Sequence, residues 1–232
     1  MTHKASLVAF ATLLSIAPAA SRADCTVVPP HTYDDGAAFH RIAGFMADQM
    51  RTNGNSAVVS AISVNMDACH LGFLPSCAAG GLSWAALVCP GCVWDHKSTI
   101  RSMLGHDYTD VPGVYAELFL DIWSNIHYGF VGREASFSPW ELQTAATLPV
   151  AGKTDAFDVL AVQIGIDLYD KYGYRPNNIT TTAVENAILV RLGDMCTDSY
   201  HLRYLGNDSG IGEAPPDSGI GEAPVPPDGP PR

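Results

Sequence analysis

Two segments of the chain carry residue types that could perform chemistry. The first, "SNIHYGFVGRE" at 124–134, follows an apolar run and holds an amide, an imidazole, a phenol and an ion pair. Residues 114–128 have the apolar spacing of a helix that ends at Gly129 and Gly132. The residues gathered at this helix end are Asp121, Trp123, Asn125, His127, Tyr128 and Arg133. They could form a site, or simply a helix C-terminus that favours a cation such as His127.

The second segment is "CPGCVWDHKSTI" at 89–100. Trp94, Asp95, His96 and Lys97 stand together after a proline–glycine turn. Asp95 could be a catalytic acid, or it could cap a helix that runs through Met103. Both interpretations stay open at this point.

Together these segments resemble the polymorphic bacterial toxin type 44 domain. The resemblance rests on "PG" and "WDHK" within 90–97, on "DIWSNIHYGFVGREASFS" at 121–138, and on "IGIDLYDKYG" at 164–173. It covers roughly 90–173 well and 36–90 weakly. One departure is Ser136, where the pattern has a glycine. The resemblance implies a compact helical toxin domain described as a probable ribonuclease. The positions that match its motifs are Asp95, Lys97, Asp121, Asn125, His127 and Tyr128.

A metal-independent ribonuclease needs a base, an acid and a cation for the phosphorane charge. His127 would be the proton shuttle, because the pKa of an imidazole lies near neutrality. Asp121 or Asp95 would orient it, and Lys97 or Arg133 would hold the phosphate. The positioning groups would be Asn125 and Tyr128. No cofactor and no metal ligand set is expected, and the other histidines, His201 among them, are interpreted as surface or packing residues.

Two alternatives remain. A peptidoglycan-cleaving muramidase needs two carboxyl groups across a sugar, for which Asp95 and Asp121 are the candidates. Trp94 and Trp123 would then form the apolar wall of the sugar-binding site or stack on the sugar. The protein could also be a non-enzymatic secreted effector or binding protein, whose polar cluster is a buried network. The partners considered are therefore RNA, cell-wall glycan and an immunity protein, and the chain is expected to be a monomer without a membrane span.

The elements that must position these residues are predicted to be helices, so the fold class is an all-α, compact, single-domain bundle. Residues 34–50 place Phe39, Ile42, Met46 and Met50 on one stripe. "SPWE" at 138–141 and "TAVE" at 182–185 have the pattern of capping boxes. Asp155 is expected to begin a helix that Gly173 ends, with Asp158 as a helix-start acid. Residues 56–64 and 81–88 are apolar and predicted to be buried helices.

The chain divides into three parts. Residues 1–24 have a positive start, an apolar middle and small residues at the end, which predicts a signal peptide and a secreted protein, extracellular or periplasmic. Residues 25–205 are the expected catalytic domain. Residues 206–232 repeat "DSGIGEAP" and are predicted to be a disordered tail. The net charge of −11 disfavours long-range attraction of polyanions.

Cysteines and sequons add two further expectations. An even number of cysteines in an exported chain predicts a disulfide framework, with the pairing left open. The six are Cys25, Cys69, Cys77, Cys89, Cys92 and Cys196. Asn178 and Asn207 begin N-glycosylation sequons.

Overall fold

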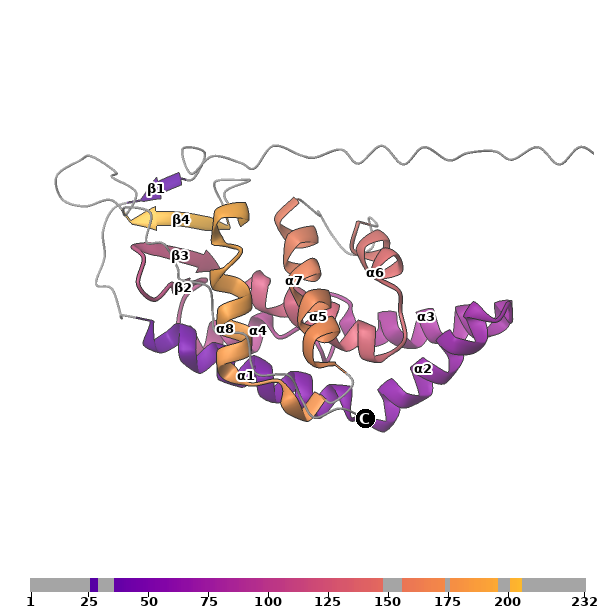
Figure 1. The fold of residues 1–232 in the computed structure, drawn as a ribbon. Helices are drawn as coiled ribbons and strands as arrows, with labels where there is room; N and C mark the ends of the chain where they lie inside the picture. Colours follow the sequence, from indigo (N-terminus) through magenta and orange to yellow (C-terminus); the bar gives the residue numbers. More distant parts are fainter. Residues whose placement is uncertain (1–25, 29–35, 148–155, 174–175, 196–200, 206–232) are drawn as a thin grey trace, which may run out of the picture.

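Helices dominate the structure, a computed structural model that describes residues 26–28, 36–147, 156–173, 176–195 and 201–205 (Figure 1). The expected helical class is confirmed. The α-helices are α1 (Ala37–Gly54), α2 (Ala57–His70), α3 (Leu74–Val88), α4 (Lys97–Leu104), α5 (Asp121–Glu134), α6 (Pro139–Ala146), α7 (Ala156–Tyr172) and α8 (Thr181–Leu189). Short 3-10 turns cover Pro176–Asn178 and Leu192–Met195. The expected signal peptide, the tail, Cys25, Asp155, Cys196 and Asn207 lie outside the described residues.

A small sheet at one end of the molecule was not predicted. It has the order β1 (Thr26–Val28), β4 (Leu202–Leu205), β3 (Ala116–Phe119) and β2 (Tyr108–Asp110). The prediction of one helix over 114–128 is wrong in its first half, because β3 pairs antiparallel with both β2 and β4. These long-range pairings override a local pattern that also suits a helix. As a result α5 begins at Asp121, the residue that the sequence had placed in mid-helix.

Helix starts follow the sequence in most places. The apolar stripe of α1 is buried as expected, and the capping box of Ser138 and Glu141 is present. The box predicted at 182–185 is misplaced by two residues, because Thr180 is the residue whose side chain accepts from the N–H of Ala183. Asn178, the first residue of one of the two N-glycosylation sequons, is exposed.

The core forms where α5 crosses α7. A Cβ on Gly129 would lie 2.2 Å from the carbonyl oxygen of Val162, and one on Gly165 would lie 2.1 Å from that of Ile126. Only glycine permits helix axes to approach so closely. The predicted helix end at Gly129 and Gly132 is therefore wrong, since α5 continues through both to Glu134. The expectation of close backbone approach is confirmed.

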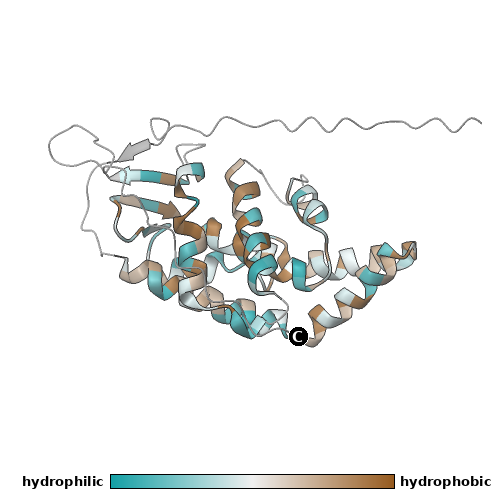
Figure 2. Cartoon of the chain, viewed as in Figure 1, coloured by the Kyte–Doolittle hydropathy of each residue, from teal (hydrophilic) through white to brown (hydrophobic). Residues whose placement is uncertain are grey.

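The helices α2 and α3 form a hairpin that projects from the body (Figure 1). A Cys69–Cys77 disulfide closes its tip, and Cys89 bonds to Cys92 just after α3. All four described cysteines are thus in disulfides. Hydrophobic colouring in Figure 2 runs along the inner helices and also over the far end of this hairpin. None of the described helices combines the length and hydropathy that crossing a bilayer requires.

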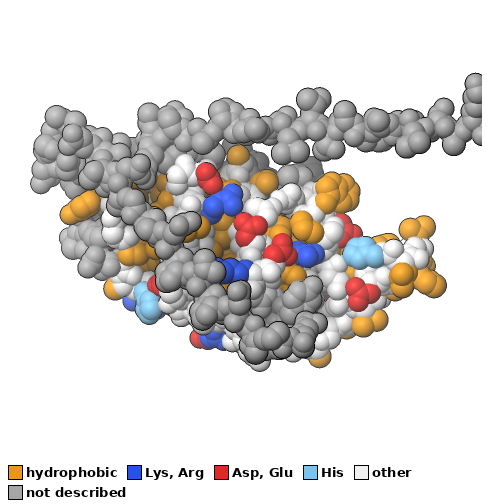
Figure 3. All heavy atoms as spheres, in the orientation of Figure 1, with side chains coloured by type: hydrophobic (Ala, Val, Ile, Leu, Met, Phe, Trp, Pro, Cys, Tyr) orange, Lys and Arg blue, Asp and Glu red, His pale blue; other side chains and the backbone are white. Residues whose placement is uncertain are grey.

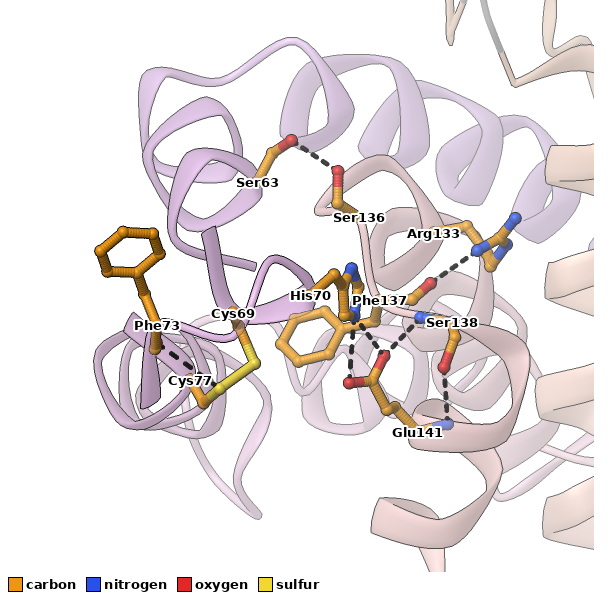
Figure 4. Close-up of polar contacts among 10 residues, drawn as sticks. All are labelled: Ser63, Cys69, His70, Phe73, Cys77, Arg133, Ser136, Phe137, Ser138 and Glu141. Atoms are coloured by element: carbon orange, nitrogen blue, oxygen red, sulfur yellow. Dashed lines mark hydrogen bonds and ion pairs between the residues drawn. A yellow bond between two sulfur atoms is a disulfide. The ribbon is translucent and has the colours of Figure 1, made fainter. Parts of the chain in front are cut away.

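The hairpin is tied to the body beside the α5–α6 connection (Figure 4). The hydroxyl groups of Ser63 and Ser136 lie 2.7 Å apart, and His70 pairs with Glu141 at 3.2 Å. Ser136 has φ of +66°, a left-handed conformation that glycine adopts most easily. A glycine, which the resemblance implies at this position, would adopt this backbone angle without strain.

Candidate functional site

A polar cluster forms where the first turns of α5 and α7 meet the start of β4. Asp121 Oδ2 lies 3.3 Å from His201 Nε2, and Asn125 donates from Nδ2 to Asp158 Oδ1 at 2.6 Å. Asp121, Asp158 and His201 each offer one atom within 4.8 Å of the others. We call Asp121, Asn125, Asp158 and His201 the acidic cluster. Two carboxylates, an imidazole and an amide therefore meet at one place.

The imidazole of the acidic cluster is buried, and its carboxylates are half-buried. The His201 ring stacks on Phe157 with centroids 4.2 Å apart and meets Phe119 edge-on. The Asp121 side chain is 15% exposed, whereas that of His201 is 5% exposed. Asp121 Oδ1 is buried and has no hydrogen-bond partner among the described residues. A substrate could therefore reach the carboxylates, with His201 held behind Asp121.

The acidic cluster also has the composition of a cation site. Oxygen and imidazole nitrogen are ligands that several divalent cations accept. Asp121, Asp158 and His201 would supply the three ligand atoms, and Asn125 would orient Asp158. No local pattern in the sequence indicated this set, because its members come from three distant segments.

His127 lies in a different environment from Asp121. It is 0% exposed, and its Nε2 lies 2.9 Å from the amide nitrogen of Asn53 on α1. The rings of His96 and Trp94 lie edge-on to it, with centroids 4.5 Å and 6.0 Å away. The turn at 94–97 thus faces the imidazole of His127, as the sequence interpretation requires.

Both histidines of this pair are held neutral. Burial, followed by the charge of His96, places the pKa of His127 well below its ordinary value. Burial lowers the pKa of His96 to about 4, although the carboxylate of Asp95 acts in the opposite direction. His127 is thus buried away from solvent, and its described contacts are those of a packing residue.

Asp95 closes the turn that precedes α4. Its carboxylate accepts from the backbone N–H of Gly91 at 2.9 Å and of Lys97 at 3.4 Å, and it pairs with the Lys97 ammonium at 3.4 Å. Burial alone would raise the pKa of Asp95, but these hydrogen bonds and the lysine charge outweigh it and lower the pKa. The N-cap of α4 is His96, one residue further on, so the observed contacts of Asp95 stabilise the turn before the helix.

The remaining predicted site residues are engaged elsewhere. Trp123 is 0% exposed, packs against Phe39 and donates to Thr109, so it cannot wall a substrate. Tyr128 donates to the carbonyl oxygen of Leu142, and burial raises the pKa of Tyr128 to about 12.

Arg133 donates to the carbonyl oxygen of Phe137 and pairs with Asp170 at 3.5 Å. It also lies over the ring of Tyr169. These contacts anchor the end of α5 and do not reach the acidic cluster.

The structure therefore divides the expected single site in two. Asp121 and Asn125 join the acidic cluster, whereas Trp94 and His127 form a buried aromatic cluster beside the Asp95–Lys97 pair. The sequence interpretation missed His201 and treated Asp158 only as a helix-start acid. Asp158 carried a weak signal, since it lies three residues after another aspartate at a helix start. His201 carried none, because only the β3–β4 pairing brings it to Asp121.

These features define a mostly helical, disulfide-bonded protein whose central helix carries a half-buried cluster of acidic and imidazole groups. Residues 83–171 match the family model described as Bacterial toxin 44. The resemblance drawn from the sequence is therefore confirmed over this segment, which contains Asp95, Asp121 and Asp158 but ends before His201. Neither a curated protein nor a solved structure matches the chain.

Proposed function

We propose that this protein is a secreted, toxin-like hydrolase that cleaves RNA at the acidic cluster. The observation that carries the proposal is the pairing of Asp121 with His201, beside the carboxylate of Asp158. Export would depend on residues 1–24, and the toxin character on the Bacterial toxin 44 match. The proposed ribonuclease therefore uses residues that a substrate can reach as its catalytic groups, in place of the expected His127.

The cluster offers groups for the two proton transfers that RNA cleavage needs, whereas its four residues include no Lys or Arg for the phosphorane charge. Asp121 would accept the proton of the ribose 2′-hydroxyl, while the contact with His201 Nε2 holds its carboxylate in place. Asp158 would donate a proton to the departing 5′-oxygen, closing a 2′,3′-cyclic phosphate. The Asn125 amide donates to Oδ1 of Asp158 and so orients this carboxyl group.

A muramidase is the second candidate, and one observation favours it. Retaining glycosidases hold two carboxyl groups about 5–5.5 Å apart. Asp121 and Asp158 bring oxygens within 4.8 Å of one another, and Phe119 and Phe157 line the nearby imidazole. The pair proposed from the sequence, Asp95 and Asp121, is replaced by Asp121 and Asp158, because the contacts of Asp95 are with its own turn.

One comparison separates the candidates. Mature protein with intact disulfides is incubated with RNA and, separately, with bacterial cell walls. We expect RNA shortening that falls by about 10²–10⁴-fold in Asp121→Asn and in Asp158→Asn. Wall clearing lost in the same variants would establish the muramidase instead. Neither activity in a folded sample would favour the non-enzymatic effector or binding protein.

The matched control is His40→Gln. His40 pairs with Glu185 at 2.7 Å on the surface, so this variant also breaks a histidine–carboxylate contact, but away from the cluster. Its activity should equal that of the wild type. A further experiment repeats the assay with a metal chelator. The proposed chemistry uses no metal, so the activity should be unchanged. Loss of activity restored by a divalent cation would make the cluster a metal site.

An immunity protein is a partner that a toxin domain would require inside a producing cell. If such a protein covers the acidic cluster, Asp121→Asn should weaken the complex as well as the activity. Co-purification with a candidate partner would test this, with His40→Gln again as the control.

A further inference from the structure

The α2–α3 hairpin exposes far more hydrophobic surface than the rest of the protein. Among the described residues, six of the ten large hydrophobic side chains that are exposed lie within 57–88. They are Val58, Val64, Leu71, Phe73, Leu74 and Leu82. The three in the turn and at the start of α3 are 65–81% exposed. Figure 3 shows hydrophobic side chains gathered at this end of the molecule. Soluble proteins rarely expose a contiguous apolar surface of this kind without a binding role.

The same hairpin is almost free of charge. Between residues 57 and 94 the only carboxylate is Asp67, there is no Lys or Arg, and 71–94 contains no charged residue at all. The whole chain, by contrast, has a net charge of −11. Four of the six exposed side chains, Leu71, Phe73, Leu74 and Leu82, therefore lie in the charge-free part. Removing it from water would cost little desolvation of charged groups.

The hydrophobic side chains lie on opposite outer faces of the hairpin. Gly80 of α3 packs against Met66 of α2, since a Cβ on Gly80 would lie 2.7 Å from the Met66 sulfur. Val64 and Leu82 each lie two residues from that contact, about 200° around their own helices. They therefore point away from the helix–helix contact in opposite directions. The turn residues add a third direction, at the tip.

This shape decides the kind of partner. A stable protein–protein interface buries roughly 1,600 Å² across a continuous surface. A flat protein partner, or the convex tip of a second copy, could contact only one side of the hairpin. Lipid acyl chains can cover a convex protrusion on every side that does not face the body. A lipid surface thus accounts at once for the exposed side chains at the tip and on the two outer faces beside it, Val58 at the base of α2 excepted.

We propose that the tip of the α2–α3 hairpin inserts into one leaflet of an electrically neutral lipid bilayer. The 15 residues of α3 span about 22 Å, against a hydrocarbon core of about 30 Å, so the hairpin is immersed and does not cross. The absence of Lys and Arg excludes recognition of anionic headgroups. The Cys69–Cys77 disulfide fixes the turn that carries Leu71, Phe73 and Leu74.

Body contacts hold the hairpin in a fixed orientation. At its base Trp84 packs against the rings of Trp94, Tyr128 and Phe137. Ser63 bonds to Ser136 on the neighbouring connection (Figure 4). The projecting end therefore presents the same side chains to any membrane that it meets.

The test is flotation with phosphatidylcholine vesicles, using mature protein with both described disulfides intact. Wild-type protein should float with the vesicles, and high salt should not release it, because charge does not drive the binding. Leu82→Glu and Phe73→Glu should each reduce the bound fraction at least about tenfold. Val190→Glu is the matched control. Val190 is 66% exposed, similar to the two test residues, but lies on the body.

A second readout does not depend on loss of binding. Phe73→Trp places an indole at the tip, and vesicles should shift its fluorescence to shorter wavelength. Thermal melting would show that each surface variant folds. The proposal is overturned if the wild-type protein stays with the vesicle-free fraction, or if Leu82→Glu binds as well as Val190→Glu. Concentration-dependent dimerisation that Leu82→Glu abolishes, without vesicle binding, would assign the surface to a second copy instead.

Discussion

Acid should destabilise this protein through the buried pair of His96 and His127. The centroids of their rings lie 4.5 Å apart, and both residues are buried among aromatic side chains. His96 Nε2 and His127 Nδ1 have no hydrogen-bond partner among the described residues. A proton on either ring would therefore place a charge in a buried site, where the cost of burial outweighs the attraction of Asp95 for His96.

The size of the effect follows from the pKa of His96. Burial lowers it from 6.5 to about 4. In the unfolded chain the imidazole binds its proton below about pH 6.5, whereas the folded chain does so only near pH 4. Stability is thus lost as the pH falls through this window, since the unfolded state binds more protons. At about 1.4 kcal/mol for each pH unit, the loss is on the order of 3 kcal/mol.

His127 acts in the same direction, because its pKa also lies below the ordinary value. Glu134 acts in the opposite direction. Burial raises the pKa of its carboxyl group to about 7, so the folded state binds that proton more readily and gains stability as the pH falls from 7 to 4.5. A wild-type profile alone would mix these effects, and the comparison with a variant isolates the histidine contribution.

The perturbation is His96→Phe, which keeps a ring against Phe45 and His127 but cannot be protonated. Urea unfolding would be followed by circular dichroism at about pH 7 and about pH 4 with the disulfides intact. Between these two pH values the wild type should lose about 3 kcal/mol more unfolding free energy than the variant. His40→Gln, which removes an exposed histidine, should behave as the wild type does.

Parallel pH profiles for the wild type and His96→Phe would refute the reasoning. That result would mean that the ring of His96 is hydrated or already paired in solution. The neutral, packing role assigned to His127 would then fail with it, and the imidazole would return as a candidate for proton transfer.

Three further outcomes are expected. Glu134→Gln should stabilise the protein above about pH 7 and flatten its profile between pH 4.5 and 7, measured by thermal melting, because Glu134 Oε1 is buried without a described partner. Gly165→Ala should cost about 3 kcal/mol or more in urea unfolding, since the new methyl group meets backbone atoms of α5, whereas Gly81→Ala, with nothing within 4 Å, should be neutral or slightly stabilising. Ser136→Gly should be more stable than Ser136→Ala by about 1 kcal/mol in the same assay, because both lose the bond to Ser63 but only glycine relieves the positive φ.

Local patterns in the sequence were sufficient for most helices. Capping at Ser138 and the apolar stripe of α1 depend on neighbours within one or two turns, so a single segment determines them. The helix predicted before Asp121 was wrong because this segment is a strand whose pairing partners are distant in sequence, at Tyr108–Asp110 and Leu202–Leu205. The same pairing places His201 beside Asp121. One unpredicted strand pair thus accounts for both the missed sheet and the missed member of the acidic cluster.

The division of the expected site has an equally simple cause in helix geometry. Residues two apart on a helix point about 200° away from each other, and residues four apart lie on the same face. Asp121 and Asn125 are four apart and face the acidic cluster, while His127 is two further on and faces α1 and α4. A motif that reads as one polar stretch therefore supplies opposite sides of α5. Its first half can meet a substrate at the surface, and its second half packs the core that holds α5 in place.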